Sequence, residues 1–188
     1  MKKIFVVAAA ALLTLSASAQ NLKFAHVNYN ELVMLMPEMD QAREVINASQ
    51  KEAEETYGAM VEEYQTKANQ YQQKQATWTA AIRESKEREL MDIQNRLQEF
   101  QQTISQELQQ QQNQLMAPIQ EKAQKAVADL AKAKGYAAVF DVSQFLYYNE
   151  TAIVDLTAEA RKALNIPADR TLESLQAELQ AQAAAAQQ

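Results

Sequence analysis

Apolar residues recur at helical spacing through a long central stretch of the chain, from about Met39 to Ala133. The stretch has a single glycine, Gly58, and a single proline, Pro118, and is otherwise dense in Gln, Glu, Lys and Ala. Its first half carries an aromatic residue at every seventh position: Tyr57, Tyr64, Tyr71 and Trp78. Because seven residues make about two helical turns, these aromatic side chains share one face of a helix.

The second half of the stretch carries its own apolar stripe, in steps of three and four residues. Its members are Leu90, Ile93, Leu97, Phe100, Ile104, Leu108, Leu115, Ile119, Ala126 and Leu130. Such steps indicate a helix with one apolar seam. Two amphipathic helices of similar length in series predict a long antiparallel hairpin. We interpret one set of residues as the seam through which its helices pack, rather than as an exposed aromatic ladder: Tyr57, Tyr64, Tyr71, Trp78, Leu90, Leu97, Phe100 and Ile104.

The register of this hairpin follows from pairing the two stripes. Facing residues of an antiparallel pair have numbers that add to a constant. Trp78 with Leu90 and Tyr71 with Leu97 both add to 168. This register places the tip of the hairpin near Glu84.

The middle of the hairpin contains two weak points. Gly58 lies inside the outgoing helix, where glycine costs about 1 kcal/mol relative to alanine. Pro118 lies inside the return helix, where proline removes a backbone hydrogen bond and kinks the helix. On the predicted register they face Gln110 and Gln50. Gly58 and Pro118 are therefore hinge candidates, and a merely tolerated imperfection stays open as the alternative.

Short β-prone segments flank the hairpin on both sides. The predicted strands are Leu22–Tyr29, Tyr136–Asp141 and Phe145–Tyr148. Gly135 follows the last lysines of the hairpin and marks its end. The fold class is thus α+β, a small β body with a long helical arm inserted into it. Because three strands leave exposed edges and little apolar cover, we expect copies of the chain to associate.

The expected organisation has four parts. Residues 1–19 form a signal peptide, since Lys2 and Lys3 precede a short apolar run and Ala17-Ser18-Ala19 is an A-x-A cleavage site. An uncleaved anchor is the alternative, which the short run disfavours. Three further ranges describe the mature chain: a discontinuous β body over 20–37 and 134–166, the arm over 38–133, and a partly disordered C-terminal tail over 167–188.

Charge and composition narrow the function classes. Without Lys2 and Lys3, the 18 basic residues fall to 16 against 24 acidic ones, a net charge of −8. This balance disfavours nucleic acid as a partner, because phosphate binding needs a basic surface. The chain has no cysteine, and His26 is its one histidine, so no metal site is expected. Without a Gly-rich phosphate loop or a cluster of catalytic side chains, we expect neither an enzyme nor a bound cofactor.

Several short motifs occur in a fixed order around the hairpin. Phe24–Asn28 precedes it, Gly135–Asp141 follows it, and Tyr147–Asn149 and Val154–Thr157 come next. Together with the signal peptide, this layout resembles the Skp/OmpH family of periplasmic chaperones over about residues 22 to 166. The resemblance implies a homotrimer whose strands build a shared β barrel, with three helical arms around a central cavity. It implies a periplasmic, ATP-independent holdase that binds unfolded outer-membrane proteins and prevents their aggregation.

Three apolar residues off the seam are the candidates for contact with such clients: Val61, Met91 and Met116. Methionine suits irregular surfaces because its side chain is flexible and polarisable. The best-known members of the family are strongly basic, whereas this chain is acidic. At the predicted tip the acids Glu84, Glu87 and Glu89 cancel Arg83, Lys86 and Arg88, so direct lipid binding is not expected. The alternative function is a non-enzymatic coiled-coil spacer or adaptor of the cell envelope.

Overall fold

The computed structural model of the protein describes residues 22–185, and the predicted signal peptide lies outside them. The described chain divides into two compact units. The first, which we call the arm, is Met36–Lys122. The second, which we call the body, contains the described residues up to Leu35 and from Ala123 onward. The protein is mostly helical with one small sheet, which is consistent with the predicted α+β class.

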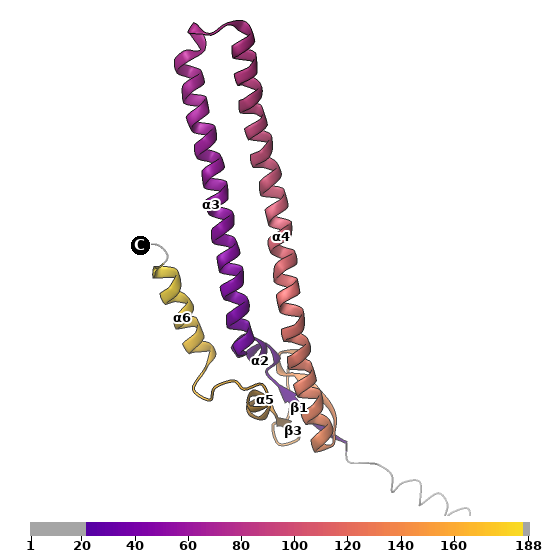
Figure 1. Cartoon of the computed structure of the whole chain (residues 1–188). Coiled ribbons are helices and arrows are strands. Elements are labelled where there is room, and N and C mark those ends of the chain that lie inside the picture. Colours follow the sequence, from indigo (N-terminus) through magenta and orange to yellow (C-terminus); the bar gives the residue numbers. More distant parts are fainter. Residues whose placement is uncertain (1–21, 186–188) are drawn as a thin grey trace, which may run out of the picture. The chain divides into compact units, whose positions relative to one another are not determined.

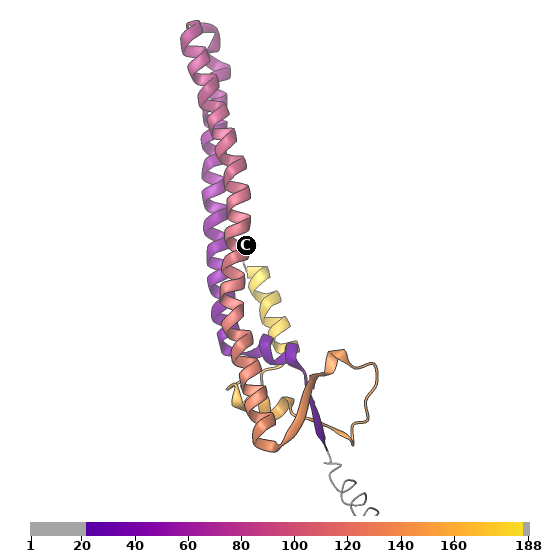
Figure 2. The same cartoon turned by 90° about the vertical axis from the view of Figure 1, so that its right-hand side faces the viewer.

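Two long helices form the arm. Helix α3 spans Pro37–Lys74, and a short 3-10 helix at Gln75–Thr77 connects it to α4, which spans Ala80–Lys134. The two helices lie side by side (Figure 1), also in the view turned by 90° (Figure 2). Proline at the first turn of α3 costs no hydrogen bond, because that N–H has no partner within a helix. Thr79 caps α4, as its Oγ1 accepts a hydrogen bond from the Ile82 N–H at 3.4 Å.

Contacts between α3 and α4 give a register that differs from the predicted one. Gln94 Nε2 donates to Tyr64 Oη at 2.7 Å, and Gln111 Nε2 donates to Ser49 Oγ at 3.0 Å. These residue numbers rise along α3 as they fall along α4, and they add to 158 and 160 instead of 168. The turn therefore lies between the helix ends at residues 75–79, and Glu84 lies inside α4. The predicted position of the tip near Glu84 was wrong. Apolar residues recur every three or four positions on both helices, so apolar residues of α3 still face apolar residues of α4 when one helix is shifted along the other by three or four residues.

The body contains a three-stranded parallel sheet in the order β2-β1-β3. Strand β1 spans Lys23–Val27, β2 spans Tyr136–Asp141 and β3 spans Ile153–Asp155. The third strand is not the predicted Phe145–Tyr148, which is irregular and follows a 3-10 helix at Val142–Gln144. Its aromatic residues favour a strand locally, but a strand also needs a pairing partner, and β3 takes the free side of β1.

Three short helices complete the body: α2 over Tyr29–Leu35, α5 over Thr157–Ala163 and α6 over Leu172–Ala185. Asn28 begins α2 with a reciprocal pair of bonds, since the Glu31 N–H donates to Asn28 Oδ1 at 3.1 Å and Asn28 Nδ2 donates to Glu31 Oε2 at 3.2 Å. The buried core of the body consists of Ala25, Val27, Leu32, Val33, Leu35, Ala123, Leu156, Ala160, Leu164, Ile166 and Leu175. These side chains come from the sheet, from α2, α4, α5 and α6, and from the segments on either side of α5.

The end of α4 agrees with the prediction, whereas the boundary between arm and body differs from it. Gly135 has φ +72°, the left-handed conformation that ends α4 where the sequence indicates. The last turns of α4, however, belong to the body rather than the arm, since Val127 and Ala131 line a groove with Val139 of β2. Within the tail, which was expected to be partly disordered, Leu172–Ala185 form helix α6. Alanine and glutamine both favour a helix, and the buried Leu175 attaches α6 to the core.

Candidate functional site

The aromatic residues of the seam contact one another and polar groups of the arm. Tyr57 stacks on Phe100 with ring centroids 6.5 Å apart, and Tyr71 meets Trp78 edge-on at 5.9 Å. Gln101 Nε2 donates to Tyr57 Oη at 2.8 Å, and Tyr71 Oη donates to Glu87. Tyr57, Tyr64, Tyr71, Trp78, Leu90, Leu97, Phe100 and Ile104 are all half-buried. The seam is thus partly covered along its whole length, and none of these eight side chains is fully buried.

An ionic network joins α3 to α4 near the turn. Lys67 of α3 bonds Glu89 of α4, and Lys86 also donates to Glu89 at 2.8 Å. The Glu63 carboxylate forms ion pairs with Lys67, with Nζ at 3.9 Å, and with Arg96, with Nη2 at 3.1 Å. Hydrogen bonds from Lys67 first, and then from Lys86, lower the pKa of Glu89 to about 2. Two of these ion pairs, Lys67 with Glu89 and Arg96 with Glu63, therefore join the two helices near the turn.

Glu89→Gln is expected to destabilise the arm near neutral pH and to have little effect in strong acid. A carboxyl with a depressed pKa stabilises the folded state above its ordinary pKa of 4.5, and that contribution is lost as the pH falls from there through about 2. Urea denaturation followed by Trp78 fluorescence at several pH values measures the gap between wild type and variant. Glu84→Gln is the matched control, since Glu84 lies 3.8 Å from Arg88 on its own helix only. If the difference in stability between wild type and Glu89→Gln is the same at pH 2 as at neutral pH, the stabilising role of the Glu89 carboxylate is contradicted.

The two hinge candidates lie at different positions from those expected. Pro118 lies inside the continuous helix α4 and shares a shallow groove of about 360 Å³ with Ala42 and Val45, so it faces the start of α3 rather than Gln50. Gly58 follows Tyr57, which contacts Gln101, so it does not face Gln110. A Cβ at Gly58 would have no atom within 4 Å, which means that glycine is not required there for packing.

Pro118→Ala is expected to stabilise the arm by about 1–3 kcal/mol, because proline inside a helix costs about 3 kcal/mol relative to alanine. Small-angle scattering is expected to show a narrower range of arm conformations at the same time. Gly58→Ala is the comparison, with an expected gain of about 1 kcal/mol. A Pro118→Ala variant whose scattering equals that of wild type would make the proline an incidental imperfection.

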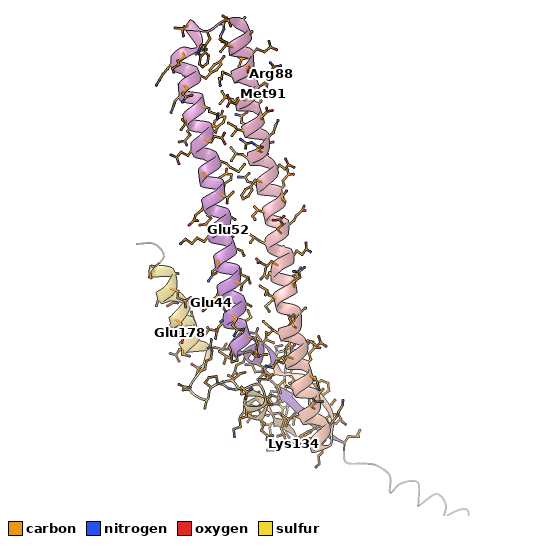
Figure 3. The ribbon with its side chains drawn as sticks, viewed as in Figure 1. Glu44, Glu52, Arg88, Met91, Lys134 and Glu178 are labelled. Atoms are coloured by element: carbon orange, nitrogen blue, oxygen red, sulfur yellow. The ribbon has the colours of Figure 1, made fainter. Side chains whose placement is uncertain are left out.

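The three candidates for client contact are not brought together. Met91 is 53% exposed, whereas Val61 and Met116 are half-buried. Figure 3 shows Met91 beside Arg88, toward the turn end of α4. On the observed register Val61 and Met116 lie at other levels of the arm, so the three residues form no single patch.

Sequence reasoning missed two hollows that flank the seam in the middle of the arm. One has a volume of about 500 Å³ and the other about 480 Å³. Both are lined by Ala53 of α3 and by Phe100, Ile104 and Leu108 of α4. They form because small side chains on α3 do not fill the space beside large ones on α4. Ala53 lies four residues before Tyr57 and thus on the same face of α3, but the predicted register did not place it opposite Ile104.

The body presents apolar side chains at its surface. Leu146 is fully exposed and Tyr147 is 85% exposed in the irregular segment after β2. Phe140 of β2 and Val154 of β3 are also exposed, and these two strands are the outer strands of the sheet. An apolar groove of about 320 Å³ lies on the body between β2 and the end of α4. Exposed apolar residues at open sheet edges are typical of a surface that another chain covers.

His26 is part of the core of the body. It is 6% exposed, its Nδ1 lies 3.8 Å from Asp155 Oδ1, and its ring meets Tyr148 edge-on at 4.7 Å. Within residues 22–185, no three His, Asp or Glu side chains gather in a way that could hold a metal ion. In the same part of the chain, no helix is both long and apolar enough to cross a lipid bilayer.

A family model described as outer membrane protein (OmpH-like) matches residues 23–164, which include the sheet, both arm helices and α5. The search of curated proteins found no match.

Proposed function

The chain belongs to the OmpH-like family of periplasmic chaperones, and from this membership we propose that it is an ATP-independent holdase of the periplasm. It binds unfolded outer-membrane proteins and prevents their aggregation. Its body associates into a homotrimer with a shared β barrel, and three antiparallel hairpin arms enclose the cavity that takes the client. The family match over most of the chain is the observation that carries the proposal.

The packing of the arm supports this function. Ala42 of α3 and Ile93 and Ile119 of α4 are buried, whereas the eight seam residues keep part of their surface accessible. A holdase needs many weak contacts with diverse chains rather than one exact fit, and partly exposed apolar side chains along a deformable arm provide them. Glutamines along α4 also offer both donors and acceptors to the backbone of an extended client.

The body supports association of copies. The sheet has three strands in the described residues, with β2 and β3 at its edges. A parallel sheet is normally covered on its faces and closed or protected at its edges. Exposed Phe140 and Val154 on these edge strands are the apolar groups that further strands of neighbouring copies would cover. A coiled-coil spacer, the alternative function, needs no such body.

Aggregation of a urea-unfolded outer-membrane barrel after dilution tests the function. The mature chain is expected to suppress the turbidity at a near-stoichiometric amount, equally with and without ATP. Serum albumin at the same mass concentration controls for unspecific protection. If a correctly associated protein gives no more protection than albumin, the spacer or adaptor function is favoured instead.

A further inference from the structure

The two hollows of the arm lie in its most acidic section. On the observed register, residues 44–62 of α3 lie beside about 97–115 of α4. These ranges contain seven acidic residues and one basic residue, Lys51, which gives a net charge of −6. The section toward the turn, residues 63–96, contains five acidic and six basic residues, a net charge of +1. Negative charge is therefore concentrated beside the hollows rather than spread along the arm.

The larger hollow combines this charge with an apolar floor. Phe100, Ile104 and Leu108 are half-buried and form the floor together with Ala53. Glu52 of α3 and Glu107 of α4 stand at its rim. We call these six residues the mid-arm groove, and Figure 3 shows Glu52 along the middle of α3.

The rim carboxylates have no cation of their own. Within residues 22–185, neither Glu52 nor Glu107 has a basic group within 4.0 Å, and Lys51 instead pairs with Glu55 at 3.9 Å. This differs from the section near the turn, where Glu63 and Glu89 are each bonded to basic side chains. The field of the mid-arm groove is thus available to a cation from outside the chain.

We propose that the mid-arm groove binds extended client segments in which Lys or Arg side chains alternate with apolar ones. Apolar side chains of such a segment contact Phe100, Ile104 and Leu108. The aliphatic stems of its basic side chains lie on the same surface, and their charged heads reach Glu52 and Glu107. This inference rests on the proposed function and names the kind of segment for which the acidic arm is selective.

Two labelled peptides of equal length and equal apolar content test the preference, one with lysines and one with glutamates at the same positions. Titrated into the full mature protein at low salt, the lysine peptide is expected to bind about tenfold more tightly. High salt is expected to reduce the difference, because the attraction acts between exposed groups. Equal affinity for the two peptides overturns the inference.

Two matched variants test whether the preference for the lysine peptide arises at the mid-arm groove. Glu52→Gln with Glu107→Gln is expected to weaken binding of the lysine peptide about fivefold, from the loss of exposed ion pairs. Glu150→Gln with Glu178→Gln removes the same charge from exposed positions of the body and is expected to change affinity less than about twofold. An equal loss in both variants means that net charge, rather than the groove, attracts the peptide, and overturns the inference.

Ala53→Leu tests the groove without changing its charge. The larger side chain fills the hollow, so affinity for the lysine peptide is expected to fall about fivefold while the arm stays folded. Unchanged affinity overturns the assignment of the site.

The proposed function and the mid-arm groove can fail separately. A protein that binds the lysine peptide but does not suppress aggregation contradicts the holdase function. A protein that suppresses aggregation but binds both peptides with equal affinity contradicts the groove alone.

Discussion

Light scattering on the mature chain is expected to give about three times the mass of one chain, and Leu146→Asp with Tyr147→Asp is expected to reduce it to that of a single chain. The two side chains are 108% and 85% exposed. If neighbouring copies cover them, each Asp would become a buried and unpaired charge, which costs several kcal/mol. Because every copy carries the change, the cost recurs at each interface of the assembly.

The double variant is informative because Leu146 and Tyr147 are exposed in the single chain. Leu146 and Tyr147 cover little of the body in the described structure, so their replacement is not expected to unfold it. Circular dichroism and the urea midpoint of the body are expected to change only as far as association itself contributes to them. A loss of mass with retained secondary structure therefore places these residues in the contact between copies.

Ile82→Asp is the matched control for this experiment. Ile82 is an exposed apolar residue in the first turn of α4, where an acidic side chain is favourable. Its variant is expected to keep the mass of wild type. If the double variant at Leu146 and Tyr147 also keeps this mass, the segment is not part of the contact between copies. A wild-type protein with the mass of one chain would contradict the trimer.

The sequence was informative wherever a local signal determines a local conformation. The reciprocal bonds between Asn28 and Glu31, the proline at the start of α3 and the left-handed Gly135 each depend on residues within one turn of the chain. The family could also be predicted, since each short motif is local and the order of the motifs around the hairpin can be read along the sequence without knowledge of the packing. The family model confirms that prediction over residues 23–164.

The predictions failed where the structure depends on which of several segments, distant in the sequence, pack against each other. Phe145–Tyr148 has the composition of a strand, yet Ile153–Asp155 pairs with β1. The stripes of α3 and α4 predict which faces meet, but several registers match apolar with apolar. The connection at residues 75–79 selects one of them, and no glycine marks it in the sequence. The mid-arm groove could not be predicted, because it exists only in the register that places Ala53 beside Ile104.

Ile93→Ala and Ile104→Ala are expected to have very different effects, although the sequence places both residues in the same stripe. Ile93 is 1% exposed, between the contacts of Glu89 with Lys67 and of Gln94 with Tyr64. Truncation of a buried isoleucine to alanine costs about 2–5 kcal/mol, from lost transfer energy and from the cavity that remains. For an arm in which few other side chains are fully buried, this is a large part of its stability.

Ile104 lies between the two hollows and is half-buried. Its truncation removes less contact and enlarges spaces that are already open, so we expect a cost of about 1 kcal/mol. Urea denaturation followed by fluorescence of Trp78, the one tryptophan of the chain, reports on the arm because Trp78 packs on Tyr71 at its end. Equal losses in the two variants would show that the middle of the arm is packed as tightly as the section near the turn. A loss at Ile93 several times that at Ile104 supports an arm whose middle keeps apolar surface accessible to a client.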